Sequence, residues 1–280
     1  MKKLKIGFIG QGYIGKNYAD DFEDRGFDVV RYALEKPYNK NGEAIGICDI
    51  VFIAVPTPTT SNGFDSSIIK KVIKLVGRDK IVVIKSTILP GTTNEIQSEN
   101  PDIFLMHSPE FLTAINAKND AKKPKRNIIG IPNESDEFYK KAKLVMSVLP
   151  RAPFDLICPV KEAEFIKYGG NCFLYTKIVF MNLFYDLVKA EKCDWEIIKK
   201  AMVVDERIGS SHMDPVHFSG RGAGGYCFIK DFAAFSYFYK KLIKDENGVR
   251  VLESLEEKNK DLLKQSSKDL DLLASIYGDV

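Results

Sequence analysis

The hydrophobic residues in the first half of the chain form short runs that are separated by amphipathic stretches. Apolar runs of this length predict β-strands over residues 5–9, 28–33, 49–55, 80–85, 103–106, 127–131 and 154–157. Helical spacing of the apolar residues predicts helices over residues 13–25, 66–76 and 135–148. Because strands that alternate with helices usually build a doubly wound parallel sheet, we expect residues 1–159 to form one α/β domain.

The hydrophobic pattern changes after Pro159. Residues 160–191 predict one long helix whose apolar residues nearly encircle it, which is typical of a helix buried on most sides. Gly169 and Gly170 within this helix are costly unless another element packs closely against them. Further helices are predicted over residues 194–203, 231–243 and 249–276. We therefore expect residues 160–280 to form a second, all-α domain.

Composition narrows the class of protein. A net charge of +3 over 280 residues gives no reason to expect a nucleic acid or a membrane as partner. The five cysteines are odd in number and lack C-x-x-C spacing, which argues against disulfides and a zinc site and for a reducing compartment. No signal peptide is visible, and the most apolar stretch, 172–188, contains charged residues. We expect a cytoplasmic protein without a metal.

The first apolar run leads directly into the sequence G-Q-G-Y-I-G at residues 10–15. In a G-x-G-x-x-G turn the first glycine makes the bend, the second admits a pyrophosphate and the third allows close packing of helix and strand. The sequence therefore predicts a dinucleotide site, against the alternative of a purely structural turn. The candidate residues are Gly10, Gly12, Tyr13, Ile14 and Gly15.

The acid that should bind the ribose hydroxyls is missing from its usual place at the end of the second strand. Ala33 occupies the aligned position, and Glu35 lies two residues further on and is our candidate substitute. Arg31 and Lys36 flank this position, and an arginine here can favour a 2′-phosphate. We expect NAD as the cofactor and leave NADP open.

The segment 224–231 reads G-G-Y-C-F-I-K-D and combines a thiol, a cation and a carboxylate behind two glycines. Cysteine is a strong nucleophile near neutral pH when its environment favours the thiolate. Lys230 and Asp231 follow Cys227 by three and four residues, so a helix starting here would place them on one face. The alternative is a glycine loop followed by an ordinary core cysteine.

Polar groups also follow the predicted strands, at the edge of the sheet where ligands of such folds bind. Thr57 and Pro58 follow one strand, Thr87 follows the next, and the sequence H-S-P-E-F-L at residues 107–112 follows a third. On the long helix, Lys167 and Asn171 are four residues apart and share a face. Each feature alone also fits a turn, a helix cap or a solvated charge.

Together these segments resemble the UDP-glucose/GDP-mannose dehydrogenases, which are NAD-dependent enzymes that oxidise a nucleotide sugar twice, from alcohol to carboxylate. The matching segments, in family order, are Gly10 to Gly15, residues 55–58, residues 85–87, residues 108–112, residues 124–130 around Arg126, Glu164 with Lys167 and Asn171, residues 205–209, and the segment around Cys227. The resemblance implies a Rossmann-type domain followed by a 6-phosphogluconate-dehydrogenase-like helical domain.

The resemblance also implies catalytic roles. Cys227 attacks the aldehyde made by the first hydride transfer, and the second hydride transfer then gives a thioester. Lys167 and Asn171 stabilise the negative oxygen at the reacting carbon. Asp231 and Thr87 hold a water that accepts the alcohol proton, and Glu110 activates the water that hydrolyses the thioester.

The remaining implied residues contact the cofactor or the substrate. Thr57, Pro58, Thr87 and Lys230 are assigned to the cofactor, with Lys230 also a candidate for the substrate. The substrate set implied by the resemblance is Phe111, Leu112, Arg207, Gly224 and Gly225. In this family the counterpart of Arg207 enters a neighbouring subunit's site, so the resemblance implies a homodimer, for which the long apolar helix is a sensible core.

The chain departs from the family pattern in several places. Relatives usually continue into a third α/β domain, so here that domain has been removed, is supplied by a partner, or the substrate differs. The loop between Arg207 and Cys227 is longer than usual and carries His212, His217 and Arg221, which either rebuild part of a nucleotide site or are solvated. Ile229 and Thr113 replace a common Pro and Arg.

Two other functions remain open at this point. One is a cofactor-binding relic that no longer turns over, and the other is a two-electron dehydrogenase of the β-hydroxyacid type, which would not use Cys227. UDP-glucose is the default substrate only because it is the commonest one in the family.

Overall fold

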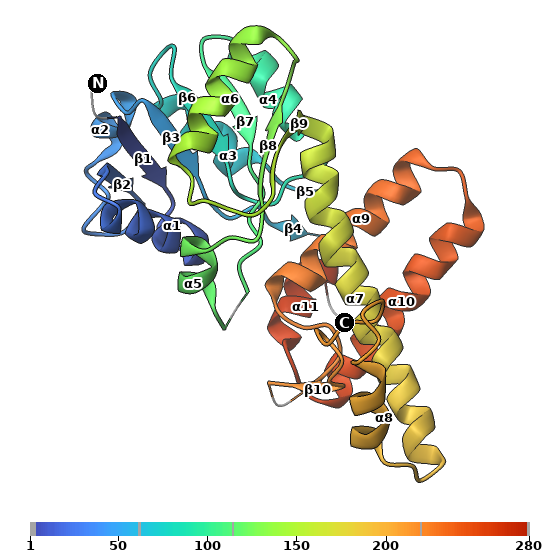
Figure 1. Ribbon diagram of the computed structural model, residues 1–280. Helices are drawn as coiled ribbons and strands as arrows, with labels where there is room; N and C mark the ends of the chain where they lie inside the picture. The colour runs from blue at the N-terminus through green and yellow to red at the C-terminus, as the bar shows by residue number, and fades with distance from the viewer. Residues whose placement is uncertain (1–3, 61–62, 114, 219, 279–280) are drawn as a thin grey trace. The chain divides into compact units, whose positions relative to one another are not determined.

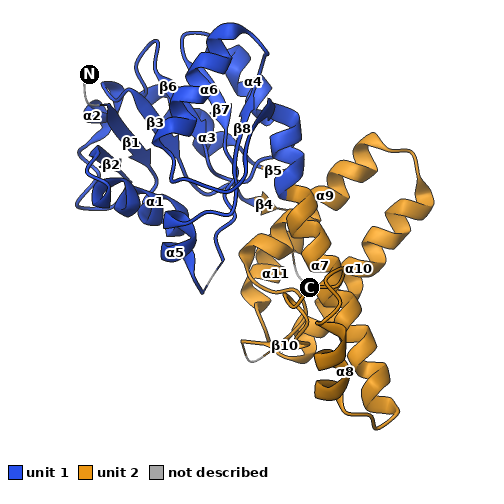
Figure 2. Cartoon of the chain, viewed as in Figure 1, with its two compact units in different colours: residues 1–58, 65–167 blue, residues 59–64, 168–280 orange. Residues whose placement is uncertain are grey.

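The computed structural model of the chain describes residues 4–60, 63–113, 115–218 and 220–278. The chain divides into two compact units (Figure 2). Unit 1 comprises residues 1–58 and 65–167, and unit 2 comprises residues 59–64 and 168–280.

Unit 1 contains a seven-stranded sheet in the order β2-β1-β3-β6-β7-β8-β9. Its strands are β1 (Lys5–Ile9), β2 (Asp28–Tyr32), β3 (Ile50–Ile53), β6 (Ile81–Ile84), β7 (Phe104–His107), β8 (Asn127–Ile131) and β9 (Asp155–Pro159). The first five strands are parallel, and β8 and β9 are parallel to each other, whereas the β7·β8 pair is antiparallel. The predicted α/β fold is therefore confirmed, with the last two strands reversed relative to the other five.

Helices cover both faces of this sheet (Figure 1). They are α1 (Tyr13–Asp24), α2 (Gly42–Gly46), α3 (Ser67–Val72), the 3₁₀ turn η1 (Ile73–Leu75), α4 (Thr92–Glu99), α5 (Ala117–Lys122) and α6 (Asp136–Val148). Side chains of a strand alternate between faces. Phe8 of β1 accordingly packs into the core under α1 and α6, while Gly7 faces Ile45 of α2 and Cys48 beyond it.

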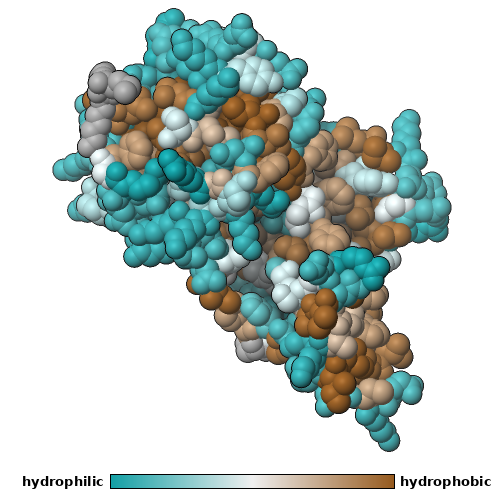
Figure 3. Space-filling model, viewed as in Figure 1, coloured by the Kyte–Doolittle hydropathy of each residue, from teal (hydrophilic) through white to brown (hydrophobic). Residues whose placement is uncertain are grey.

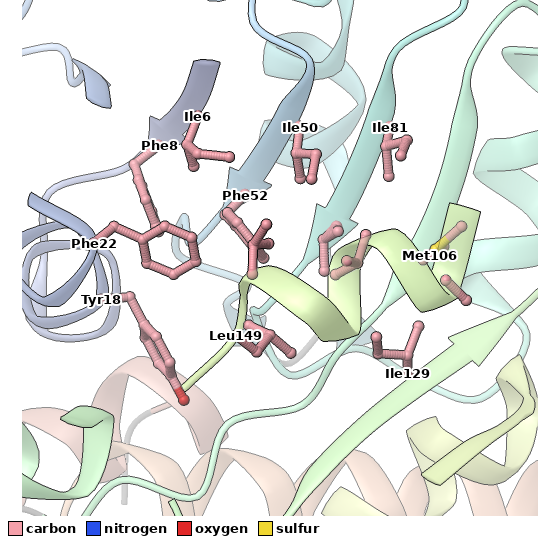
Figure 4. Packing of buried hydrophobic residues seen from close by; sticks show 14 of the residues in the cluster. Ile6, Phe8, Tyr18, Phe22, Ile50, Phe52, Ile81, Met106, Ile129 and Leu149 are labelled. Carbon is pink, nitrogen blue, oxygen red and sulfur yellow. The ribbon is translucent and has the colours of Figure 1, made fainter. Parts of the chain in front are cut away.

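Aromatic rings form the centre of the core on the α1 side (Figure 4). Phe8 and Phe52 stack with centroids 5.0 Å apart, and Phe22 of α1 meets Phe8 edge-on at 5.3 Å. This packing holds α1 against β1 and β3 and so fixes the glycine turn that joins β1 to α1.

Unit 2 is built from helices and two short hairpins. Its helices are the rest of α7 (Val160–Ala190), whose residues 160–167 belong to unit 1, then α8 (Trp195–Met202), α9 (Tyr226–Leu242), α10 (Glu246–Gln265) and α11 (Leu270–Tyr277). The hairpins pair β4 (Thr59–Thr60) with β5 (Gly63–Phe64), and β10 (Val216–His217) with β11 (Gly220–Arg221). Ile229 of α9, Leu263 of α10 and Leu273 of α11 meet in one core.

Two helices of unit 2 differ from those that the sequence predicts. Helix α9 begins at Tyr226, five residues before the predicted start at 231, so Cys227 lies inside its first turn. The single helix predicted over 249–276 is two helices, because Ser267 and Asp269 adopt left-handed backbone with φ of 52° and 54°. The resulting turn between α10 and α11 is important for the site described below.

The surface of α7 and α8 is more apolar than expected for a helix covered on most sides. Phe173 is 68% exposed, Leu187 59% and Ile197 69%. Figure 3 shows hydrophobic residues gathered on the surface over α7 and α8. Outside the neighbouring backbone of α7, no atom of the described residues lies within 4 Å of a Cβ built on Gly169 or Gly170, so no described segment packs closely against these glycines. Among the described residues, none of the helices is sufficiently long and apolar to cross a bilayer.

Candidate active site

The glycine turn between β1 and α1 gives each of its glycines a different environment. Gly10 has a φ of 92°, and a Cβ there would lie 2.2 Å from the carbonyl oxygen of Ala54. A Cβ on Gly15 would lie 1.9 Å from the carbonyl oxygen of Gly10. At Gly12, in contrast, such a Cβ would have no described atom within 4 Å apart from those of its two neighbours in the chain. Packing therefore requires the first and third glycines, while the second leaves open space.

This turn fits the pyrophosphate of a dinucleotide. Gly12 is the N-cap of α1 and makes no side-chain cap, and no acidic residue lies in the first turn of the helix. Backbone N–H groups at a helix N-terminus bind anions because they lack partners and carry the positive end of the helix dipole. Beside them, Ile14 is half-buried and Tyr13 is 49% exposed, with its hydroxyl donating to the carbonyl of Thr113 at 2.5 Å.

The candidate ribose-binding residues at the end of β2 differ in their exposure and in their partners. Ala33 is buried and Glu35 is exposed. Arg31 is only 7% exposed, and its guanidinium forms ion pairs of 2.7 Å with both Asp20 and Glu23 of α1. Arg31, the candidate ligand for a 2′-phosphate, is therefore already paired with two carboxylates of α1.

Two further cofactor candidates of unit 1 lie together. The Thr57 hydroxyl donates a 2.8 Å hydrogen bond to the carbonyl of Thr87, and both residues are buried. Pro58, which follows Thr57 in the sequence, is half-buried. These residues follow β3 and β6, which are neighbours in the sheet, so the topology brings the two loops to one edge.

A cluster of ionisable side chains is buried at the ends of β6 and β7, and we call it the strand-end cluster (Lys85, His107, Ser108, Glu110 and Lys167). The Lys85 ammonium donates to the carbonyl and hydroxyl oxygens of Ser108 at 3.1 Å. Burial lowers the pKa of Lys85 to about 8, although the nearby Glu110 opposes the shift. Burial, together with the Lys85 charge, lowers the pKa of His107 to about 3. His107 is therefore neutral in the folded protein, and neither of its ring nitrogens has a hydrogen-bond partner in the described part of the chain.

Glu110 and Lys167 form the ionic pair of this cluster. Lys167 Nζ donates to Glu110 Oε1 at 2.9 Å and to the Glu110 carbonyl at 2.7 Å, and both side chains are almost fully buried. The other carboxylate oxygen of Glu110 accepts from the Leu112 amide at 2.7 Å. The ring of Phe111 lies 5.6 Å from Lys167 Nζ. Four predicted residues of the site thus meet within unit 1.

Unit 2 brings a second set of predicted residues together. Lys230 and Asp231 are buried and form a short ion pair, and Asn171 Nδ2 donates to Asp231 Oδ2 at 2.6 Å. Burial alone would lower the pKa of Lys230, but the Asp231 carboxylate raises it above its ordinary value. The Lys230 charge is therefore paired and held inside the unit.

Cys227 lies at the exposed start of α9. It is the second residue of that helix, and Gly225, with a φ of 80°, is the N-cap. The exposed position differs from that of Cys48 and Cys172, which are buried. A negative sulfur is stabilised at a helix N-terminus, so this is a suitable position for a nucleophilic thiol.

The remaining candidates of unit 2 have less direct roles. Arg207 is 89% exposed in its side chain and pairs with Asp205 at 2.6 Å. Arg221, from the long loop, donates to Asn182 and pairs with Asp186, so it binds α7. His212 and His217 are both exposed. In the described residues no group of three His, Cys, Asp or Glu side chains is placed to hold a metal ion.

A dinucleotide turn on a doubly wound sheet and an exposed thiol at the start of a helix define an α/β protein of the cofactor-binding class. Residues 36–147 match the NAD-binding domain of the UDP-glucose/GDP-mannose dehydrogenase family, and residues 161–261 match its central domain. The chain belongs to this family, as its motifs predicted.

Individual relatives agree with this assignment. The chain is 32% identical to the UDP-glucose 6-dehydrogenase of Rickettsia bellii over 86% of its own length and 55% of that protein's. A solved UDP-glucose dehydrogenase from Pyrobaculum islandicum is similar with a TM-score of 0.80 and 26% identity, covering 99% of this chain and 72% of that one. The chain therefore spans little more than half of the curated relative. The 3-hydroxyisobutyrate dehydrogenase of Mycobacterium tuberculosis is similar over 98% of both chains with a TM-score of 0.73, but at 12% identity this shows the fold alone.

Proposed function

We propose that this protein is an NAD-dependent dehydrogenase that oxidises the primary alcohol of a nucleotide sugar to the carboxylate. The observation that carries the proposal is the position of Cys227 at the exposed start of α9, beside a glycine segment, in a chain of this family. An ordinary core cysteine would be buried, as Cys48 and Cys172 are. UDP-glucose is the substrate we propose first, because the relatives found here are named for it.

The proposed reaction removes four electrons in two steps. NAD held at the glycine turn of residues 10–15 would supply the oxidant, with two NAD molecules consumed in succession for each sugar. In the first, the alcohol loses a hydride and a proton and becomes an aldehyde. The Cys227 thiolate then adds to the aldehyde carbon, and loss of a second hydride from this thiohemiacetal leaves a thioester. Water cleaves the carbon–sulfur bond, which releases the carboxylate and restores the thiol.

The other polar residues have roles that suit their surroundings. Asn171 and Lys167 supply donors for the developing oxyanion. Asp231 accepts the alcohol proton through water, and Glu110 activates the water for thioester cleavage. In the resting protein one carboxylate oxygen of Glu110 accepts from the Lys167 ammonium and the other from the Leu112 amide. Proton transfer to Glu110 therefore depends on movement of Lys167 or of the water.

We propose NAD rather than NADP, because Arg31 is paired with two carboxylates and Glu35 is exposed nearby. A carboxylate at this position suits the ribose hydroxyls and disfavours a 2′-phosphate. We also propose a homodimer formed through the apolar surface of α7 and α8, since such exposed surface is typical of an interface. Its residues are Phe173, Phe180, Leu183, Leu187 and Ile197.

The first prediction tests the proposed role of Cys227. Cys227→Ser is expected to abolish formation of the sugar acid while NAD still binds, because serine is a far poorer nucleophile than a thiolate. The measurement is NADH formed per nucleotide sugar, across a panel of UDP- and GDP-sugars. Cys193→Ser, at another exposed cysteine, is the control and should keep wild-type turnover.

The stoichiometry of the wild-type protein separates this function from its alternatives. Two NADH per sugar support the proposed reaction, one NADH indicates a simple alcohol dehydrogenase, and none with NAD bound indicates a non-catalytic module. A Cys227→Ser protein that still makes the acid at the wild-type rate would refute the mechanism.

A further inference from the structure

The backbone that leads into Cys227 is held by side chains from a distant part of the chain. The backbone of residues 221–225 forms five hydrogen bonds with side chains of α10 and the turn after it, donating three and accepting two. We call the four side chains involved the glycine dock: Asn259, Ser266, Lys268 and Asp269. All of these contacts lie within unit 2.

Asn259 makes the central contact of the dock. Its amide oxygen accepts from the Ala223 N–H at 2.7 Å, and its amide nitrogen donates to the Ala223 carbonyl at 3.1 Å. Asn259 is 1% exposed and Ala223 is fully buried. Leucine has neither polar group and aspartate lacks the donor, so a substitution would leave buried backbone groups without a partner.

The other dock residues hold the backbone on either side. Ser266 Oγ accepts from the Arg221 N–H at 3.0 Å, and Lys268 donates to the Gly222 carbonyl at 3.2 Å. Asp269 Oδ2 accepts from the Gly225 N–H at 2.7 Å. Gly225 is the N-cap of α9, so this last contact fixes the point at which the helix of Cys227 begins.

The glycines of this segment make room for the dock. A Cβ on Gly222 would lie 2.9 Å from Asn259 Oδ1, and a Cβ on Gly224 would lie 2.2 Å from Asp269 Oδ2. Gly222 and Gly225 also have φ of 84° and 80°, values that residues with a side chain rarely adopt. Close packing thus accounts for Gly224 and left-handed backbone for Gly225, the two glycines that the resemblance assigned to the substrate.

The body of α9 is fixed separately from its start. Phe232 stacks on Tyr175 of α7 with centroids 3.9 Å apart, and Ile229 packs against Leu263 and Leu273. These contacts set the helix axis, but they lie beyond the first two residues of the helix. Within the first turn, Ile229 shares this packing and the Phe228 ring meets His212 edge-on at 5.6 Å, whereas the dock holds the backbone that enters the turn just before Cys227.

We propose that Asn259 and Asp269 are positioning residues for Cys227, which hold its sulfur at the start of α9 in the orientation needed for attack. This inference rests on the proposed role of Cys227 as the nucleophile. Ser266, Lys268 and Asp269 lie beyond residues 161–261, the part that matches the family's central domain, so three of the four dock residues are supplied from outside that match.

The test compares dock variants with a variant that loosens the same helices elsewhere. Asn259→Leu removes both amide contacts, Asp269→Ala removes the acceptor for Gly225, and Asp269→Asn keeps an acceptor oxygen. Glu256→Gln is the control, since Glu256 of α10 bonds Ser236 of α9 and Tyr277 of α11 at 2.9 and 2.8 Å and is not among the side chains bonded to residues 221–225.

The readout is alkylation of Cys227 by iodoacetamide, followed by peptide mass spectrometry between about pH 6 and 9, where thiolates form. The exposed Cys193 in the same molecule is the internal reference. A net hydrogen bond is worth about a two- to tenfold change in an equilibrium. Asn259→Leu and Asp269→Ala are expected to change the Cys227 to Cys193 rate ratio by about that factor and to shift its pH profile.

Each outcome decides for or against the inference. Asp269→Asn should retain most of the wild-type ratio, and Glu256→Gln should lower the melting temperature but leave the ratio and its pH profile unchanged. Wild-type ratios in both Asn259→Leu and Asp269→Ala, or an equal change in Glu256→Gln, would overturn it. Asp269 is partly exposed, so Asp269→Ala decides the question even where Asn259→Leu does not fold.

Alkylation needs no nucleotide sugar, so this result is independent of the proposed reaction. A wild-type protein that oxidises no sugar, with dock variants that still change the Cys227 ratio, would refute the function and keep the positioning role. An active enzyme whose dock variants keep the wild-type Cys227 ratio would support the function and refute the positioning role. In an active enzyme, kcat should fall in Asn259→Leu with little change in the KM for NAD, because the dock belongs to unit 2 and the glycine turn proposed for NAD belongs to unit 1.

Discussion

The strand-end cluster of unit 1 and the glycine dock of unit 2 hold polar groups in physically different ways. The cluster keeps charged and titratable side chains inside the unit, where the Lys167–Glu110 ion pair offsets the cost of burying two charges. The dock instead uses mostly uncharged contacts to fix a length of backbone close to the surface. We therefore expect the stability of the strand-end cluster to depend on charge and pH. The glycine dock should depend instead on the shape of the groups that it holds.

The largest expected effect comes from breaking the ion pair of the cluster. Lys167→Met leaves the Glu110 carboxylate buried without its partner, which is expected to lower the free energy of unfolding of unit 1 by about 3–5 kcal/mol. Urea unfolding checks this, with the double variant Glu110→Gln/Lys167→Met expected to recover most of the loss.

An exposed ion pair provides the matched control. Arg78 and Asp102 are 79% and 55% exposed in their side chains, so Arg78→Met should cost less than about 1 kcal/mol. Equal losses in Lys167→Met and Arg78→Met would show that the cluster does not depend on its charges.

The next effect is a pH dependence that His107 of the cluster should show and Asn259 of the dock should not. The pKa of His107 is lowered to about 3, so between that value and the ordinary pKa near 6.5 only the unfolded chain takes up a proton. Because of His107, the free energy of unfolding therefore decreases as the pH falls through this window, by about 2 kcal/mol at pH 5. His107→Leu cannot bind this proton. On going from pH 7 to pH 5, its free energy of unfolding should therefore rise by this amount relative to that of the wild type.

Urea unfolding at the two pH values measures the difference for His107→Leu and, in parallel, for Asn259→Leu. The dock variant should show the same loss of stability at both values, because Asn259 does not titrate. A His107→Leu protein with no pH-dependent gain would contradict the neutral, buried state assigned to His107.

The smallest effect sharpens the account of the dock. Gly224→Ala places a methyl group against Asp269, which must release the Gly225 N–H, so the variant is expected to lose about 1 kcal/mol. In an Asp269→Ala background the same substitution should cost less, since the bond is already absent. A double-mutant cycle by thermal denaturation measures this coupling, and strict additivity would argue against the contact.

Much of unit 1 could be predicted from the sequence because its inner strands, such as β3, β6 and β8, are buried on both faces. The predicted bounds of β1 and β8 agree with the structure to the residue, since nearly every residue in them is apolar and buried. The short helices α2, α4 and α5 were not predicted, because five to eight residues carry little periodicity and depend on tertiary packing.

The candidate site was predictable where a motif carries its own chemistry. The pairing of Lys167 with Glu110, and of Asn171 with Asp231, joins residues that the motifs had already named. The dock was not predicted. Asn259 stands among charged residues on α10 and its sequence is typical of a solvated face, and the turn at Ser267 and Asp269 uses left-handed backbone without a glycine. Only the packing of α10 against the glycine segment reveals their role.

The turn between α10 and α11 has a practical consequence for anyone who shortens or fuses this chain. A fragment cut within residues 266–269 would retain the whole G-G-Y-C-F-I-K-D segment and yet lose anchors of the backbone before it. Such a fragment would carry every reactive atom and still hold its sulfur in many orientations, so an inactive truncation would say little about the chemistry of the intact protein.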